Sequence, residues 1–349
     1  MNASAMNRNG TPMSPDLVDL LRQHDARISE VSDARTVVEH FGDVKQELDA
    51  LRSSAVVCPL PDYISIRVAG DDRAKFLHNF CTNNINDLDP GQSCEVFFCD
   101  VKARILAHGY VLAGAESHEI QMLPGDAEAL ISHLNRYIIT EDVTLTCLSV
   151  GRTTFAVAGP AIQDVLGAVE GGAEMSVSSC CLQDDVAMFR TTWDDLPVAF
   201  VSVNNETGAE TWRRVAAHAT AAGNTTFHHL RITEGYPLMG TDLTGDNMAP
   251  EADRNDLAIS YRKGCYLGQE PIARLDAMGH VNQKLFKGRA TVTDRVSDSE
   301  ELPIVTSRSL ADDASFPVLL PMSVRLASSS SAVMARTRDG AAVHLDRLV

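Results

Sequence analysis

The residues best suited to chemistry lie close together in one short segment, Lys263-Gly264-Cys265-Tyr266-Leu267-Gly268-Gln269-Glu270. Its two glycines allow tight backbone turns at positions where a side chain would clash. Between them a thiol lies two positions after Lys263, and a nearby cation favours thiolate over thiol. Cys265 is therefore the best candidate in the chain for a reactive sulfur, with Lys263 as its activating partner. An inert core thiol is the alternative.

The same segment carries groups that suit a flat polar ligand. Gln269 and Glu270 offer an amide and a carboxylate, which together can meet the donors and acceptors of a ring such as a pterin. Arg274 follows four positions later. Because Arg and Lys bind carboxylates well, Arg274 and Lys263 could meet acidic groups on the same ligand.

The pattern Lys-Gly-Cys-Tyr-x-Gly-Gln-Glu-x-x-Ala-Arg resembles the signature of the YgfZ-type folate-binding proteins, relatives of the aminomethyltransferase (T-protein) of the glycine cleavage system. Three more segments are similar to that family: Thr82–Ile85 with the following Pro90-Gly91, Phe155–Pro160 and Leu230–Pro237. The likeness covers roughly residues 48–288. It implies an α+β fold with two related folate-binding lobes, followed by a small C-terminal β-barrel.

The resemblance also implies a ligand and the residues that contact it. The ligand would be tetrahydrofolate or a substituted folate, held between the lobes. The implied folate-binding residues are Arg231, Glu234, Tyr266, Gln269, Glu270, Arg274 and Trp193. Lys263, Arg231 and Arg274 would face the acidic portions of the folate, and Cys265 would act as a thiolate in redox or cluster contact. Arg231 could instead pair with Glu234, and Trp193 could serve only in packing.

Two positions depart from the aminomethyltransferase pattern. Those enzymes resemble one another in a strand whose carboxylate works on the folate nitrogen, and here Ala107 and His108 occupy that position. His108 could accept a proton, but an imidazole does not supply a fixed negative charge. In an ungapped match Phe200 replaces a carboxylate expected to hold the pterin. That loss would cost about 1.5–3 kcal/mol, unless another acid substitutes: Glu234, Asp194 or Asp195.

These features imply a folate-binding accessory protein that supports the assembly or repair of iron–sulfur clusters, including those of tRNA-modifying radical enzymes. Its partners would be folate and iron–sulfur client or assembly proteins. The missing carboxylate argues against aminomethyltransferase activity. A tetrahydrofolate-dependent aminomethyltransferase or related one-carbon transferase remains the main alternative, and a scaffold that binds no folate is a third.

Composition narrows the class of protein. The net charge of −17 disfavours direct binding to nucleic acid, because like charges repel. None of the eight cysteines forms a Cys-x-x-Cys pair, so we expect reduced thiols and no metal site of the zinc-ribbon or ferredoxin type. No apolar run approaches the roughly 20 residues that a bilayer requires. The first residues lack the apolar stretch of an export signal, which favours the cytoplasm.

The sequence divides into four predicted segments, and the folded ones must position the candidate residues. We predict a disordered leader at 1–15, a first α+β lobe with N-terminal helices at 16–150, a second lobe with the cysteine motif at 151–280 and a β-barrel-like domain at 281–349. Ser14-Pro15 should begin a helical region that runs to about Leu51. A further helix is expected at 210–222. His228-His229 and Cys180-Cys181 are assigned to strands, where neighbouring side chains point to opposite faces.

An internal echo supports two related lobes. Val68-Ala69-Gly70 precedes a helix with Phe76-Leu77, and Val157-Ala158-Gly159, 89 residues later, precedes Val165-Leu166. Each copy places a strand before the glycine and a helix after it. The unit is also common in unrelated proteins, so the echo alone allows either interpretation.

Overall fold

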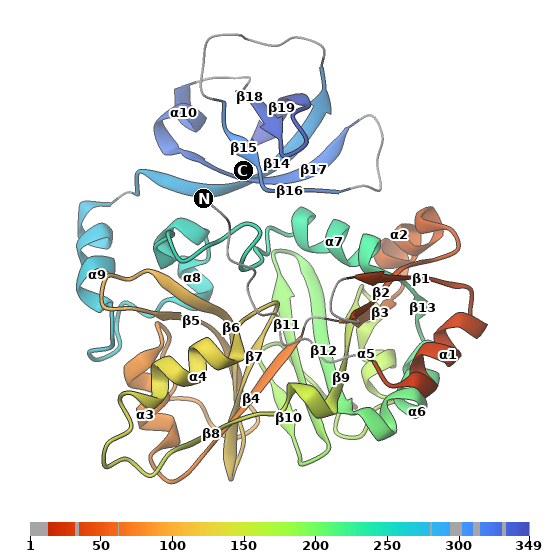
Figure 1. The fold of residues 1–349 in the computed structure, drawn as a ribbon, viewed down its shortest axis with the longest axis horizontal. Helices are drawn as coiled ribbons and strands as arrows, with labels where there is room; N and C mark the ends of the chain where they lie inside the picture. The colour runs from red at the N-terminus through yellow and green to blue at the C-terminus, as the bar shows by residue number, and fades with distance from the viewer. Residues whose placement is uncertain are drawn as a thin grey trace.

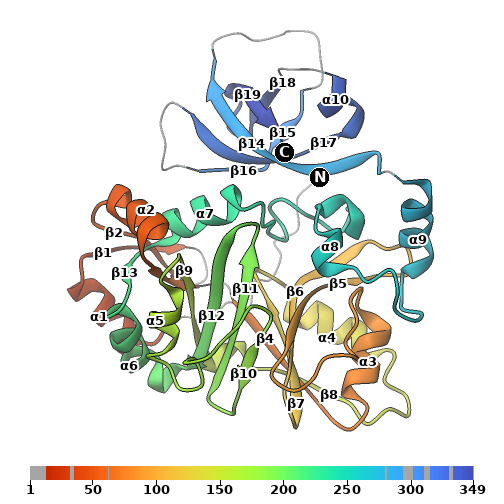
Figure 2. The same cartoon turned by 180° about the vertical axis from the view of Figure 1, so that it is seen from behind.

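The computed structural model describes residues 13–31, 35–61, 63–279, 281–293, 302–309, 315–329 and 333–348. Most of the predicted leader, residues 1–12, therefore lies outside the described part. Two α+β lobes stand side by side, and a β domain lies above both (Figures 1 and 2). The α+β class with a terminal barrel-shaped sheet is confirmed.

The first lobe has a five-stranded sheet in the order β5-β6-β7-β4-β8. Apolar side chains of two helices, α3 and α4, pack on one face of it and form a core with Ile66, Phe98 and Ile120. The elements are β4 (Ile64–Ala69), α3 (Arg73–Phe80), β5 (Ser93–Cys99), β6 (Ile105–Ala113), β7 (Ser117–Met122), α4 (Ala127–Asn135) and β8 (Thr144–Cys147).

The second lobe has a six-stranded sheet in the order β10-β11-β12-β9-β3-β13. Its elements are β3 (Val56–Leu60), η1 (Ser149–Gly151), β9 (Arg152–Ala158), α5 (Ile162–Leu166), β10 (Cys180–Leu182), β11 (Val186–Trp193), β12 (Leu196–Asn204), α6 (Asn205–Ala216), β13 (Thr220–Ala221) and α7 (Asn224–Thr233). The N-terminal α1 (Pro15–Gln23) packs against α6 through Leu17 and Leu21. As predicted, the Ser14 hydroxyl caps α1.

The echo corresponds to a real structural repeat. Gly70 and Gly159 follow β4 and β9 with φ of 107° and 121°. A Cβ would lie 2.0 Å from the Asp142 carbonyl oxygen at Gly70, and 2.5 Å from the Ser54 oxygen at Gly159, so both sites require glycine. In each lobe, the strand that precedes the repeat along the chain joins the sheet of the other lobe. Thus β3, which precedes β4, pairs with β9, and β8, which precedes β9, pairs with β4. The two lobes are thus built alike and each completes the other's sheet.

The C-terminal domain is a nearly closed six-stranded sheet in the order β15-β18-β19-β14-β17-β16. Its core is formed by short apolar runs that include Val318, Leu320 and Val343. The elements are β14 (Gln283–Val292), β15 (Ile304–Val305), β16 (Ser307–Arg308), β17 (Phe316–Ser323), α10 (Val324–Ser329), β18 (Val333–Thr337) and β19 (Ala342–Leu348).

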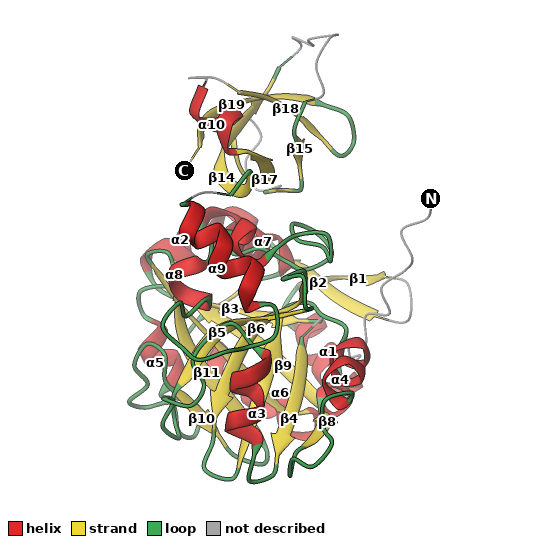
Figure 3. Cartoon of the chain, turned by 90° about the vertical axis from the view of Figure 1, so that its left-hand side faces the viewer, coloured by secondary structure: helices red, strands yellow, loops and turns green. Residues whose placement is uncertain are grey.

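Helices separate this barrel from the two lobe sheets (Figure 3). They are α7, α8 (Asn255–Ala258) and α9 (Gln269–Met278), and the short η2 (Ala249–Ala252) precedes α8. These helices and the segments between them carry all of the candidate residues except Trp193. The site must therefore be sought where the barrel, these helices and the lobes meet.

Three secondary-structure predictions were wrong. The region up to Leu51 contains a hairpin, β1 (Ala26–Val31) and β2 (Arg35–Phe41), before α2 (Val44–Ser53), because β-branched residues such as Val37 and Val38 suit a strand. The helix expected at 210–222 begins earlier, as α6, and ends at Ala216. His228 and His229 lie on α7, where Phe227 and Leu230 face the core at helical spacing. Cys180-Cys181 does lie in a strand, β10.

Candidate functional site

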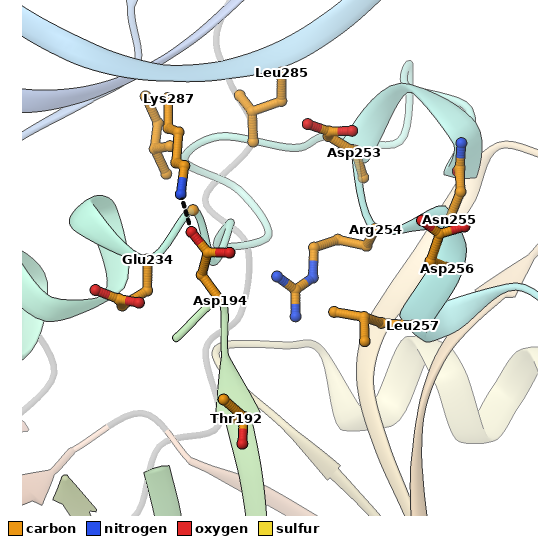
Figure 4. A pocket seen from close by; sticks show the side chains of 13 residues that line it. Thr192, Asp194, Glu234, Asp253, Arg254, Asn255, Asp256, Leu257, Leu285 and Lys287 are labelled. Carbon is orange, nitrogen blue, oxygen red and sulfur yellow. Dashed lines mark hydrogen bonds and ion pairs between the residues drawn. The ribbon is translucent and has the colours of Figure 1, made fainter. Parts of the chain in front are cut away.

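A cavity of about 600 Å³ opens where both lobes meet the barrel. We call it the junction pocket. The second lobe contributes Thr192, Asp194, Glu234 and Gly235, and the barrel contributes Leu285, Lys287 and Leu319. The remaining wall is residues 252–257, whose helix α8 packs against β5 of the first lobe. Figure 4 shows these side chains converging on one space, with Arg254 reaching into it.

Arg254 closes the inner end of the pocket and is held from behind by a buried carboxylate. Its Nε and Nη2 atoms donate to the two oxygens of Glu95 on β5, at 2.8 and 2.7 Å. Both side chains are at least nine-tenths buried. Burial alone would raise the pKa of Glu95, but the charge and hydrogen bonds of Arg254, helped by His108, lower it to about 2. Glu95 is therefore a fixed negative charge.

Two residues of β6 complete the shell around Glu95. His108 Nε2 lies 2.8 Å from the Glu95 carboxylate, and the Tyr110 hydroxyl donates to the same group at 3.4 Å. The His108 ring is fully buried and stacks between Phe97 and Tyr236. It does not line the junction pocket. The possible base at His108 thus has no path to a ligand in that pocket.

An aromatic cluster lies beneath the pocket, between the two sheets. Trp193 stacks on Tyr236 with ring centroids 4.1 Å apart, and its Nε1 donates to the Tyr110 hydroxyl at 2.9 Å. Phe200 packs against Trp193 and Tyr63 in the same core. These rings are almost fully buried. Phe200 thus places a hydrophobic ring where the aminomethyltransferase pattern suggested an acid.

Carboxylates dominate the rim of the junction pocket. Asp194 pairs with Lys287 across the boundary between lobe and barrel, and Asp253 pairs with Lys284 at 2.6 Å. Burial raises the pKa of Glu234, although the backbone N–H groups of Asp195 and Leu196 oppose this. Glu234, one of the predicted folate-binding residues, is the one that lines this pocket.

Lys263 contacts backbone carbonyls of the first lobe, whereas the sequence suggested contacts with Cys265 and with a ligand. Its ammonium is buried and donates to three backbone carbonyls, of His78, Cys81 and Asn83, at 2.5, 2.9 and 2.6 Å. These carbonyls lie at the end of α3 and just after it, where helical carbonyls lack partners. All three ammonium protons are used. Lys263 therefore ties the cysteine motif to the first lobe.

The rest of the motif packs on the outside of the first lobe. Cys265 is exposed, and Tyr266 is buried among apolar residues beside Ile272. Gln269 and Glu270 begin α9, and Arg274 is exposed further along it. None of these five residues lines the junction pocket. Their predicted roles toward folate or a cluster remain predictions.

Arg231 forms a buried structural link. It donates to Asp242 at 2.9 Å, to Ser307 of the barrel at 2.8 Å and to His228 at 2.7 Å. Asp242 in turn accepts from the hydroxyls of Thr306 and Ser307. The ion-pair partner is thus Asp242, and Glu234 takes no part. This network fastens α7 to the barrel and leaves Arg231 outside the pocket lining.

Comparison with known proteins assigns the family. The family model described as the GCVT N-terminal domain matches residues 17–255, which are more than half of the chain. The chain belongs to the GCVT family. Glu95, His108, Trp193 and Arg254 all lie within the matched region.

Curated relatives of this GCVT-family chain carry different names. A chloroplastic protein of Arabidopsis thaliana, named "Putative transferase", is 30% identical over 290 residues, 78% of this chain and 64% of that protein. The mitochondrial iron–sulfur cluster assembly factor IBA57 homologue of Dictyostelium discoideum is 21% identical over 271 residues, 70% and 64% of the two chains. The tRNA-modifying protein YgfZ of Colwellia psychrerythraea is 18% identical over 235 residues, 65% and 69%. The chain thus spans less than two thirds of the first two relatives.

A solved structure shows the same fold at low identity. The glycine cleavage system aminomethyltransferase T from Bartonella henselae matches with a TM-score of 0.80 and 16% identity, over 95% of each chain. Within the described residues no helix is long and apolar enough to cross a membrane. The same residues contain no cluster of histidine, cysteine and acidic side chains suited to a metal ion.

Sequence reasoning missed the inner residues of this GCVT-family site. Glu95, Tyr110, Tyr236 and Arg254 were not singled out, and only their neighbours His108 and Trp193 were. One signal was available for Glu95, a lone acid within the apolar strand Ser93–Cys99. A buried carboxylate requires a partner, so such a residue predicts a buried cation. The identity of that cation, 159 positions away, depends on the fold.

Proposed function

We propose that this protein binds a tetrahydrofolate in the junction pocket and serves as an accessory factor for the assembly or repair of iron–sulfur clusters, including those of tRNA-modifying enzymes. One observation carries the choice. The inner carboxylate, Glu95, is already saturated by Arg254 and His108 and is shielded from the pocket. With a pKa of about 2 it cannot take up a proton near neutral pH. The site thus favours holding a folate over transferring a carbon from it.

The pocket residues suit a folate ring. Arg254 uses Nε and Nη2 for Glu95, and no described residue accepts a hydrogen bond from its Nη1. That group could donate to a ring oxygen. Glu234 could accept N–H groups of the ring, as the carboxylate that replaces the one missing at Phe200. The cavity of about 600 Å³ lies within the size range of small-molecule sites.

The cluster-related part of the proposal rests on Cys265 and on the relatives. The thiol is exposed on a loop whose backbone is fixed by Lys263 and by a hydrogen bond from Leu267 to Asn79. A rigidly held, accessible thiol can meet a cluster or a thiol of a client protein. Two relatives bear names that refer to iron–sulfur cluster assembly and to tRNA modification.

Two measurements on the purified protein separate the possibilities. Tetrahydrofolate should bind saturably, as followed by isothermal titration calorimetry. Incubation with tetrahydrofolate and an aminomethylated lipoyl carrier protein should give no turnover above background. Absence of folate binding would leave the folate-free scaffold as the better account, and sustained turnover would replace the accessory role with a transferase.

A cysteine variant tests the cluster role. Cys265→Ser should lose most of its ability to speed recovery of an oxidatively damaged [4Fe–4S] enzyme, followed by the activity of that enzyme. The matched control is Cys181→Ser, which alters a half-buried thiol on β10 of the second lobe. Equal support by both variants and by the unaltered protein would return Cys265 to a structural role.

A second candidate function is a tetrahydrofolate-dependent transferase. Glu234 favours it, because burial raises the pKa of this carboxyl and brings it nearer to the range where a carboxyl can exchange a proton. The "Putative transferase" relative points the same way. If this candidate is right, Glu234→Gln should abolish turnover even when tetrahydrofolate is saturating.

A further inference from the structure

The charges of the junction pocket do not balance. Four carboxylates line it, Asp194, Glu234, Asp253 and Asp256, against two cations, Arg254 and Lys287. Both cations already have acidic partners: Glu95 holds Arg254, and Asp194 holds Lys287. Of the acids, Asp253 forms an ion pair with Lys284, a residue that does not line the pocket. Among the described residues, Glu234 and Asp256 have no ion-pair partner.

Among the described charged groups of the lining, a ligand therefore meets one buried donor and two carboxylate acceptors that have no ion-pair partner. The donor is Nη1 of Arg254, a side chain that is 6% exposed and points into the space in Figure 4. The acceptors are the carboxylates of Glu234 and Asp256. Each cation of the lining already neutralises an acid, so a ligand carboxylate finds no uncompensated positive charge in the pocket. The three cations that the sequence suggested for that purpose, Lys263, Arg231 and Arg274, do not line the pocket.

Resting on the proposed function, we infer that the junction pocket is selective by charge: it accepts a neutral ring with oxo and N–H groups and repels the acidic tail of the ligand. Tetrahydrofolate carries its negative charges on a glutamyl chain that lengthens by one carboxylate per residue. Folates with one glutamate should therefore bind better than folates with many. Asp256, exposed at the rim, and Glu234, deeper in the wall, set this preference.

Paired titrations test the inference. A Trp212→Phe variant leaves Trp193, which stacks on Tyr236 beneath the pocket, as the single fluorescent tryptophan. Tetrahydrofolate with one glutamate should quench it saturably. The form with five glutamates should bind at least about threefold more weakly at low ionic strength, since each added carboxylate repels the rim. The difference should shrink as salt is added.

Charge variants assign the effect to the rim. Asp256→Asn should reduce the discrimination, and Asp256→Lys should remove or reverse it. The control Asp19→Asn changes net charge equally, but on α1, away from the pocket, and should keep the discrimination. Equal or tighter binding of the five-glutamate form to the unaltered rim would overturn the inference while folate binding stands. If neither form binds, the proposed function fails and the inference fails with it.

Discussion

The buried ion pair Glu95–Arg254 affects both the stability of the fold and the chemistry of the junction pocket. Taking both charges out of water is costly, and each is tolerated only because the other is present. Breaking such a pair on one side leaves a buried charge without compensation. The pair therefore makes the floor of the junction pocket rigid and fixes which atoms of Arg254 remain for a ligand.

Glu95→Gln should lower the free energy of unfolding by about 3–5 kcal/mol, because Arg254 loses its counter-charge. Urea denaturation followed by circular dichroism measures this. Glu119→Gln is the matched control, because Glu119 pairs with Arg152 in an equally buried bridge at 2.9 Å outside the pocket. Both variants should be destabilised, but only Glu95→Gln should also weaken tetrahydrofolate binding. Equal affinity of the two variants for tetrahydrofolate would show that Glu95 does not contribute to folate binding.

Lys263 offers a second test at the residue scale. Lys263→Met should cost roughly 2–4 kcal/mol of stability, because three carbonyls lose a charged donor. Thermal unfolding checks this. Cys265→Ala, in the same loop but exposed, should change stability by less than about 0.5 kcal/mol. A Lys263→Met protein that is as stable as the original but inactive toward clusters would instead favour the activating role predicted from the sequence.

At the scale of elements, α7 couples the lobe to the barrel. Arg231 and Asp242 reach Ser307 and Thr306 of the barrel, and Arg231 also donates to His228 Nδ1 on its own helix. That hydrogen bond requires a neutral imidazole. Burial, reinforced by the charge of Arg231, lowers the pKa of His228 to about 3.

The stability of this junction should therefore depend on pH. An unfolded histidine has a pKa near 6.5, and the folded one is lower, so the unfolded state binds the proton more readily. The contribution of His228 is fully present above pH 6.5 and is lost as the pH falls toward 3. At pH 5 the expected loss is about 2 kcal/mol. Urea unfolding at pH 7.5 and pH 5 measures it, and His228→Asn should flatten this part of the profile. An unchanged profile in the variant would remove His228 as the cause.

Elements were predictable wherever local pattern and tertiary environment agree. Ser14-Pro15 begins α1, and the two strand–glycine–helix units appear where the echo placed them, because Gly70 and Gly159 face neighbouring backbone too closely for any Cβ. The hairpin of β1 and β2 was not predictable from Val37 and Phe41, whose spacing fits a helix as well as a strand. Only its packing against the second lobe decides between them.

At the scale of the whole molecule, the arrangement of the two lobes and the barrel determines which residues line the junction pocket. The cysteine motif is the most distinctive string in the sequence, but it lies on the outer side of the first lobe. The junction pocket draws its residues from segments around 192, 234, 254 and 287. No local pattern marks those residues, because their roles arise from contacts between three parts of the chain. The family likeness supplied the fold correctly, and the charges of the pocket followed only from the assembled structure.

A ligand in the junction pocket would contact the second lobe, the segment 252–257 and the barrel, and should therefore make the lobes and the barrel unfold together. Without ligand, the half-exposed pair Lys287–Asp194 adds at most about 1 kcal/mol to barrel docking at the pocket. Tetrahydrofolate at 100 times its dissociation constant adds about 2.7 kcal/mol. Scanning calorimetry of Lys287→Ala should therefore show the barrel unfolding at lower temperature than in the unaltered protein, and saturating tetrahydrofolate should move barrel and lobes upward together. A barrel transition that ignores the ligand, while the lobes respond, would place the folate on the lobes alone.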